Sequence, residues 1–176
     1  MQRELSPIKR MLLEKGVRMP HPERVDIAPD IQADRISGNH VVLHGGARLI
    51  GEKTLILDGA ILGYEQPVTI ENCFVGPNAR LNGGFFRDAV FLKNAAMASG
   101  AHVREGCILE EYAGAGHCAG IKQTILFPYV TLGSQINFCD CLMSGGTGRK
   151  HHSEVGSSYI HFNFTPQQDK ATPSLI

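Results

Sequence analysis

A repeat of six residues constrains the fold of this chain more than any other feature. From Met97 onward, each hexad opens with an apolar residue and carries a small or aliphatic residue four positions later. An amphipathic helix repeats at about 3.6 residues and a half-buried strand at about 2, so neither explains this spacing. A sustained period of six is typical of a coil of very short strands whose aliphatic residues stack inside. The hexads are Met97…Ala101, Val103…Cys107, Leu109…Ala113, Ala115…Ala119, Ile121…Ile125, Leu126…Val130, Leu132…Ile136 and Phe138…Leu142.

The N-terminal segment has a different pattern. Ser6-Pro7 predicts a helix start and Gly16 a helix stop. Residues 1–24 are therefore predicted to form a helix and linker, and residues 25–176 a parallel β-helix. One apolar stripe on the helix is predicted from the spacing of Ile8, Met11 and Leu12.

Charge and composition exclude several classes of protein. Seventeen basic residues balance seventeen acidic ones, so no net field favours nucleic acid or an anionic membrane. No apolar run approaches the roughly 20 residues that span a bilayer. The five cysteines have no secretory context, which indicates reduced thiols and a cytoplasmic location.

Four stretches of the chain resemble a known family. Residues 75–81 (VGPNARL) resemble its "IGPxAxLRP" coil, and residues 121–125 (IKQTI) resemble its "VExKxS" coil. Residues 16–26 resemble the linker into its β-helix, and residues 156–170 resemble its "GAGTxxxNYDGxxK" segment. The family is the hexapeptide-repeat acyltransferases. More narrowly, the chain is similar to the acetyltransferase domain of bifunctional N-acetylglucosamine-1-phosphate uridyltransferases.

The resemblance implies an all-β, left-handed parallel β-helix that forms a homotrimer with active sites between neighbouring subunits. It implies acetyl-CoA as co-substrate and an amino-sugar phosphate or nucleotide sugar as acceptor. By position, Lys122 would contact the sugar phosphate and Lys170 would assist. Asn163 and Phe164 would occupy the place of the family's Asn-Tyr pair. In the family, coils beyond the position of Ile176 complete the CoA groove.

The chain departs from the family at the catalytic base, which is a histidine there. Two alignments of this stretch place Phe138 or Ser134 at that position. The family's phosphate-binding arginine falls on Asn82, with Arg80 two residues away. The missing histidine, and Phe164 in place of the family's tyrosine, favour an alternative, a trimeric sugar-phosphate-binding or scaffold protein that has lost its base.

Other histidines could supply the base, because amide formation needs a neutral amine and a base with a pKa near the working pH. His151 and His152 follow a glycine-rich stretch and Arg149-Lys150, which could bind a phosphate nearby. His161 is a further candidate. Arg80 and Lys122 each follow an inward position of the repeat, so both are predicted to project outward and could bind the phosphate.

A zinc-binding protein is a third alternative. A β-helix of the γ-class carbonic-anhydrase kind would bind zinc through three histidines, and the spacing of the histidines here does not support it. Cys139, Cys141, His151 and His152 are suitable ligands within a short span. The Cys-x-Cys spacing is shorter than the usual zinc pattern, and adjacent positions of a coil point in different directions. No metal site is therefore predicted.

Overall fold

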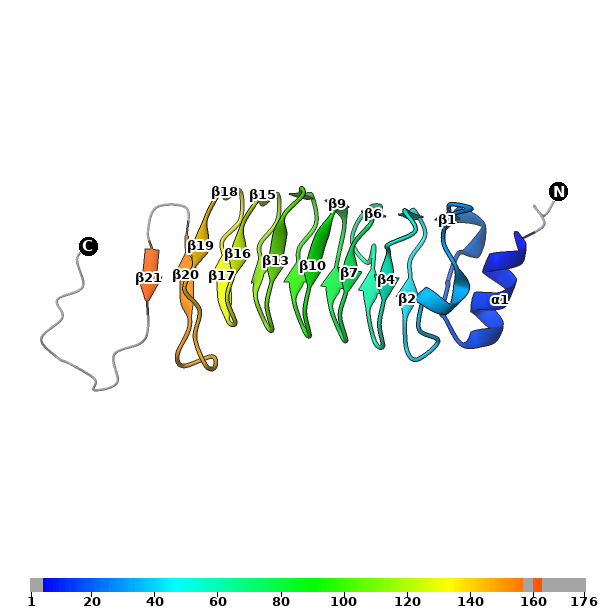
Figure 1. The fold of residues 1–176 in the computed structure, drawn as a ribbon, viewed down its shortest axis with the longest axis horizontal. Coiled ribbons are helices and arrows are strands. Elements are labelled where there is room, and N and C mark those ends of the chain that lie inside the picture. The colour runs from blue at the N-terminus through cyan, green and yellow to red at the C-terminus, as the bar shows by residue number, and fades with distance from the viewer. Residues whose placement is uncertain (1–4, 157–159, 163–176) are drawn as a thin grey trace, which may run out of the picture.

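Short strands stack into one elongated solenoid in the computed structural model, which describes residues 5–156 and 160–162 (Figure 1). The described strands form three sheets, which are the three faces of the solenoid. Strands pair in parallel throughout these sheets, apart from the antiparallel pair β20–β21. The predicted parallel β-helix is confirmed, whereas its left-handedness stays a prediction from the resemblance.

Each face consists of one strand from each successive coil. Face 1 contains β1 (Asp26–Ile27), β3 (Ala47–Ile50), β6 (Val68–Glu71), β9 (Gly84–Arg87), β12 (Ala101–Val103), β15 (Gly120–Lys122) and β18 (Asn137–Cys139). Face 2 contains β4 (Leu55–Ile56), β7 (Phe74–Val75), β10 (Ala89–Phe91), β13 (Cys107–Leu109), β16 (Ile125–Leu126) and β19 (Leu142–Met143). Face 3 contains β2 (Val42–Leu43), β5 (Ile61–Leu62), β8 (Arg80–Leu81), β11 (Ala96–Met97), β14 (Gly114–Ala115), β17 (Val130–Leu132), β20 (Ser153–Val155) and β21 (Ile160–Phe162).

The six-residue repeat places alternate side chains inside the coil. In β12, Ala101 and Val103 are buried and His102 between them is exposed. Each six-residue unit supplies one strand on one face and the turn to the next face, so three units complete one coil. Burial of these aliphatic columns against the coils above and below drives the fold, since no single coil encloses its own core.

Two hexads are shorter than the repeat predicts. Thr124 is fully buried and Ile125 is half-exposed, although the pattern placed Ile125 inside. Leu142 was likewise predicted to face inward, and it is 67% exposed. The cause is a tighter turn from face 1 to face 2, in which Gln123 and Asp140 adopt φ of +46° and +55°. This turn removes one residue, so the inward positions fall on Thr124 in place of Ile125 and on Met143 in place of Leu142.

The N-terminal helix α1 (Pro7–Lys15) covers one end of the coil stack (Figure 1). It ends at Gly16, whose φ of +109° requires glycine, as predicted. Leu12 is buried, but Met11 is 56% exposed, so the predicted stripe is wrong at that position. The Lys15 ammonium donates to the carbonyl of Ile36 at 2.6 Å and ties the helix to the first coil. Two 3₁₀ turns follow, η1 (Pro22–Arg24) and η2 (Ala33–Arg35).

All five cysteines are free thiols, as predicted. Cys73 and Cys107 are buried in the inward columns of face 2. Burial raises the pKa of both thiols, that of Cys73 to about 12, so these two serve as core residues. Among the described residues, no helix has the length and apolar character needed to cross a bilayer.

Candidate functional site

A groove with two arginines lies on the outer side of face 3, in the N-terminal half of the solenoid. We call it the arginine groove. It has a volume of about 340 Å³ and contains basic, acidic and aromatic side chains over an aliphatic floor. Its lining residues are Arg18, Pro20, Val42, His44, Ile61, Tyr64, Glu65, Arg80 and Asn82.

The backbone register of face 3 positions both arginines. Arg18 bridges to Val42, Val42 pairs with Ile61, and Ile61 pairs with Arg80. These residues are therefore outward neighbours on successive coils, because residues in register on paired strands point the same way. Three strand spacings separate Arg18 from Arg80, about 14 Å between Cα atoms, with Val42 and Ile61 between them. An anionic ligand in this groove would meet a guanidinium at each end.

His44 lies in the same groove directly after the inward Leu43. Its backbone N–H donates to the carbonyl of Leu62 at 2.9 Å, and its ring packs edge-on against Tyr64 with centroids 5.4 Å apart. Burial lowers the pKa of His44 below its usual 6.5, and electrostatic interaction with Arg18 and His21 lowers it further. The ring is therefore neutral at pH 7 and can accept a proton.

Glu65 supplies a negative charge to the groove from the turn between β5 and β6. The Asn82 amide donates to its carboxylate at 2.8 Å, and the Glu65 N–H donates to the Asn82 carbonyl at 2.9 Å. Hydrogen bonds from the Ser99 and Asn82 side chains lower the pKa of Glu65, so it is ionised at neutral pH. The groove thus combines two fixed cations, one fixed anion and one neutral imidazole.

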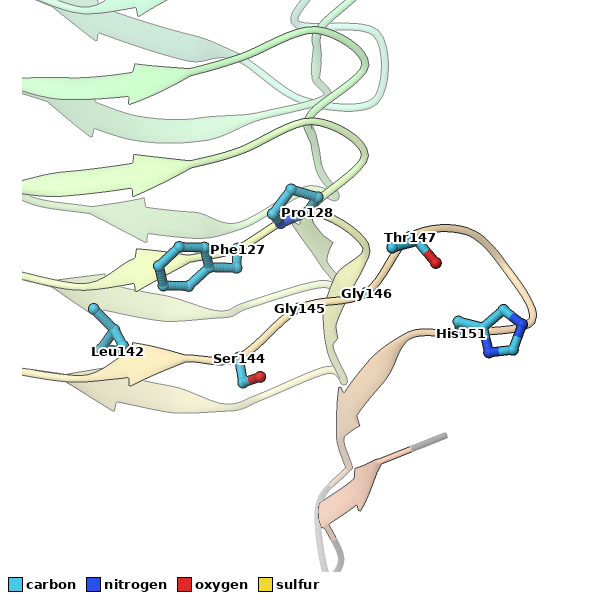
Figure 2. Close-up of a pocket in the computed structure, with 8 residues that line it drawn as sticks. All are labelled: Phe127, Pro128, Leu142, Ser144, Gly145, Gly146, Thr147 and His151. Carbon is cyan, nitrogen blue, oxygen red and sulfur yellow. The ribbon is translucent and has the colours of Figure 1, made fainter. Parts of the chain in front are cut away.

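A second cavity, of about 660 Å³, lies beside the long loop between β19 and β20 (Figure 2). We call it the loop cavity. Phe127 and Leu142 come from neighbouring coils, while His151 comes from the returning arm of the loop at the other end of the cavity (Figure 2). Its lining residues are Phe127, Pro128, Leu142, Ser144, Gly145, Gly146, Thr147 and His151.

Backbone contacts fix the shape of this loop. The Gly146 N–H donates to the carbonyl of Pro128 at 2.7 Å, and His151 N–H donates to the carbonyl of Gly148 at 2.9 Å. The hydroxyl of Ser153 donates to the carbonyl of Ser144 and closes the base of the loop. A Cβ on Gly146 would overlap with the carbonyl oxygen of His151, so the two arms approach this closely only with glycine here.

His152 faces a different cavity from His151. It lines a space of about 480 Å³ that we call the tyrosine cavity, together with Asn94, Tyr112, Tyr129, Thr131 and Arg149. The two adjacent histidines were predicted to act in one place, with Arg149 nearby as a phosphate ligand. In the structure, Arg149 shares a cavity with His152, and His151 lines the loop cavity at the opposite end from Phe127 and Leu142 (Figure 2).

Lys122 and Arg80 both project outward, as predicted, but from different faces. Arg80 belongs to face 3, and Lys122 is on β15 of face 1. The Lys122 ammonium lies 3.2 Å from the carboxylate of Glu105, which also pairs with Arg87 at 3.2 Å. A hydrogen bond from the backbone N–H of Glu105 itself, followed by hydrogen bonds from the Arg87 and Lys122 side chains, lowers the pKa of Glu105 to about 2. Lys122 is therefore part of an ion-pair network on another face from the arginine groove.

The remaining predicted site residues lie at the C-terminal end. The backbone of His161 belongs to β21, opposite Glu154 of β20, and its side chain is outside the described part of the chain. Asn163, Phe164 and Lys170 lie outside the described residues altogether. Their predicted roles, and that of His161 as a base, stay predictions.

The groove also contains residues that the sequence did not single out. Arg18, His44 and Tyr64 are separated along the chain and meet only through the coil register. One signal was available, because residues 64–67 interrupt the repeat, and a loop that leaves a regular scaffold often carries binding groups. Arg18 lies within the stretch 16–26 that resembles the family's linker.

Within residues 5–156 and 160–162, no three side chains of His, Cys, Asp or Glu gather as metal ligands would. The thiol of Cys141 donates to the carbonyl of Cys139 at 2.9 Å, so this pair is engaged locally. No family model matches the chain, and no curated protein matches it. What the chain shares with the acyltransferases is therefore the parallel β-helix, and its activity must be inferred from the cavities.

Proposed function

We propose that this protein is an acetyl-CoA-dependent N-acetyltransferase that acts on an amino sugar carrying a phosphate or a nucleotide. The observation that carries the proposal is the arginine groove, where Arg18, Arg80, Glu65 and His44 line one space. An amino-sugar phosphate is an anion at its phosphate and a cation at its amine. Guanidinium groups bind phosphate well, and a carboxylate attracts an ammonium. The groove's charges thus complement both ends of such an acceptor.

His44 is the base in this proposal. An amine attacks a thioester only after losing a proton, and His44 is neutral at pH 7 because burial and the neighbouring cations lower its pKa. The ammonium first gives one proton to solvent, and the neutral amine nitrogen bonds to the carbonyl carbon. The carbon–sulfur bond then breaks, and the second proton that the nitrogen gives up passes through His44 to the departing thiolate. The loop histidines His151 and His152 line other cavities, which is why we assign this step to His44.

The loop cavity suits the acetyl-CoA arm, because Phe127 and Leu142 make it apolar and the Gly145-Gly146 backbone leaves room beside it. It lies at face 2, whereas the arginine groove lies on face 3 nearer the N-terminus. We therefore propose that donor and acceptor meet between neighbouring copies, as the resemblance to trimeric acyltransferases implies.

The outer side of face 2 supports such an assembly. Large apolar residues stand in register on each of its strands, about 4.8 Å apart from coil to coil. Leu142 is exposed and the other residues of the column are partly exposed, and a contiguous apolar surface of this kind is suited to a protein–protein contact. The column consists of Leu55, Phe74, Val90, Ile108, Ile125 and Leu142. Sedimentation equilibrium should show a trimer, and Ile108→Lys should shift it to monomer, whereas a wild-type monomer would contradict the assembly.

The direct test is an assay of thiol release from acetyl-CoA with glucosamine 1-phosphate as acceptor. We expect turnover by the wild-type protein and little by Arg80→Ala. Binding of the sugar phosphate without turnover would instead identify a binding or scaffold protein, the alternative that the absent family histidine favours. The control variant His102→Gln lies on face 1, away from the groove, and should keep wild-type turnover.

A further inference from the structure

Two tyrosines occupy a backbone position where tyrosine is unusual. Tyr112 and Tyr129 both have φ of +61° at the turn from face 2 to face 3. The same turn position is His40, Gly59, Asn78 and Asn94 in preceding coils. Glycine, asparagine and histidine are the residue types that adopt positive φ more readily than tyrosine does. A bulky side chain there is an outlier that often marks a functional site.

The hydrogen bonds of the turns show that these positions are equivalent. The N–H of Asn94 donates to the carbonyl of Pro77 at 2.9 Å. The N–H of Tyr112 and that of Tyr129 donate in the same way to Lys93 and Glu111, each at 3.1 Å. The backbone therefore repeats from coil to coil, and only the side chain differs. The local backbone conformation does not require tyrosine at these two turns.

The two rings form an open aromatic platform. They stack with an interplanar angle of 5° and centroids 4.8 Å apart. Tyr112 remains 49% exposed, so the stack is accessible to a ligand. The platform lines the tyrosine cavity beside Asn94, Thr131 and Arg149. A flat ring system, hydrogen-bonding side chains and a guanidinium together match a nucleobase with a phosphate attached.

The floor of face 3 connects this cavity to the arginine groove. Arg80, Ala96, Gly114 and Thr131 are outward neighbours on β8, β11, β14 and β17. Ala96 and Gly114 present almost no side chain, so a ligand can lie along the surface between Arg80 and Thr131. That separation is three strand spacings, about 14 Å. A nucleoside diphosphate sugar is an elongated ligand with a base at one end and a sugar at the other.

We propose that the tyrosine cavity binds the nucleoside diphosphate of a nucleotide-linked amino sugar, with the base on the Tyr112–Tyr129 stack and a phosphate at Arg149. The inference rests on the proposed function, because it names the acceptor of that reaction as a nucleotide sugar. It also predicts binding that can be measured without any acetyl transfer.

Titration calorimetry of the wild-type protein with UDP, GDP and dTDP tests the proposal. We expect at least one of them to bind, and the double variant Tyr112→Asn/Tyr129→Asn to weaken it by about 5- to 150-fold, since each stacked base contributes about 1–3 kcal/mol. Asparagine already occupies this turn position in Asn78 and Asn94, so the variant should fold and keep its melting temperature. Tyr112→Phe/Tyr129→Phe retains the stack and should bind as the wild type does.

Three results would overturn the inference: no binding of any of the three nucleotides, equal binding by the folded asparagine variant, or binding of adenosine 3′,5′-bisphosphate alone. The last would assign the platform to the nucleotide of CoA. Turnover of glucosamine 1-phosphate without nucleotide binding would leave the proposed acetyl transfer standing. Nucleotide binding that depends on the tyrosines, in a protein without acetyl transfer, would retain the nucleotide site and reject the enzyme.

Discussion

The arginine groove and the loop cavity are built in opposite ways. Arg18, Val42, Ile61 and Arg80 stand on successive coils, so the backbone ladder of face 3 determines where each side chain lies. The loop of residues 144–152 leaves the repeat and depends on a few bonds, such as Gly146 N–H to the Pro128 carbonyl. A site on the ladder is preorganised, and a site on a loop can adapt to its ligand. This contrast favours the groove for catalysis and the loop for binding the donor.

The largest effect on kcat is expected when the histidine of the arginine groove is compared with a histidine of the loop cavity. We expect His44→Gln to lower kcat for glucosamine 1-phosphate by roughly 10²- to 10⁴-fold, the usual contribution of a general base. His151→Gln should lower kcat far less, because that ring is at the far end of the loop cavity. Steady-state acetylation assays of both variants give the comparison. A large loss in His151→Gln with an active His44→Gln would reverse our assignment.

The second largest effect is expected when a guanidinium group is removed from the arginine groove. Arg80→Ala should raise the Kd for glucosamine 1-phosphate by roughly 10- to 150-fold, since a hydrogen bond to a charged group contributes about 1.5–3 kcal/mol. Lys122→Ala is the matched control, because this cation lies on face 1 beside Glu105. Calorimetric titration measures both. If Lys122→Ala weakens binding and Arg80→Ala does not, the phosphate site is on face 1.

The pH dependence sharpens the role of His44. Activity requires the neutral form of His44, so kcat/KM should rise with pH. Because the pKa of His44 is lowered from 6.5, the ordinary value for histidine, kcat/KM should reach half its plateau below pH 6.5. Arg18→Ala removes one of the charges that lower it and should move the midpoint toward higher pH. A midpoint at or above 6.5 in the wild type, or no movement in Arg18→Ala, would speak against His44 as the base.

The smallest effect is expected at the Lys122 network. Glu105→Gln removes the carboxylate that pairs with Lys122 and Arg87, and exposed pairs of this kind contribute little to stability. Their contribution is present above the ordinary pKa of Glu105, 4.5, and is lost as pH falls toward about 2. Urea unfolding at pH 7 should therefore shift slightly, with no change in sugar-phosphate binding. Tighter binding in Glu105→Gln would identify Lys122 as a phosphate ligand.

The sequence predicted the fold well because its period reports the geometry of the coil directly. It was wrong at Ile125 and Leu142, where tight turns at Gln123 and Asp140 remove one residue. Such turns are defined by backbone conformation, and the residue type at a position is only a weak indicator of that conformation. Side-chain direction was predicted correctly for Arg80 and Lys122, since each follows a buried residue, Ala79 or Ile121.

The candidate site was harder to predict. His44 and Arg18 come from different turns of the coil, and only the lateral register between coils brings them into one groove. His151 and His152 are adjacent in sequence, yet they line separate cavities because the loop reverses at that point. Proximity along the chain is therefore a poor guide to a shared site in a solenoid, whereas the same position on successive coils is a good one.

The most direct measurement is a crystal structure of the protein soaked with glucosamine 1-phosphate. The proposed function predicts the phosphate beside the guanidinium of Arg80 or Arg18, with the amine within hydrogen-bond reach of the His44 ring. Density for the sugar phosphate beside Lys122 or His151, with an empty arginine groove, would contradict it.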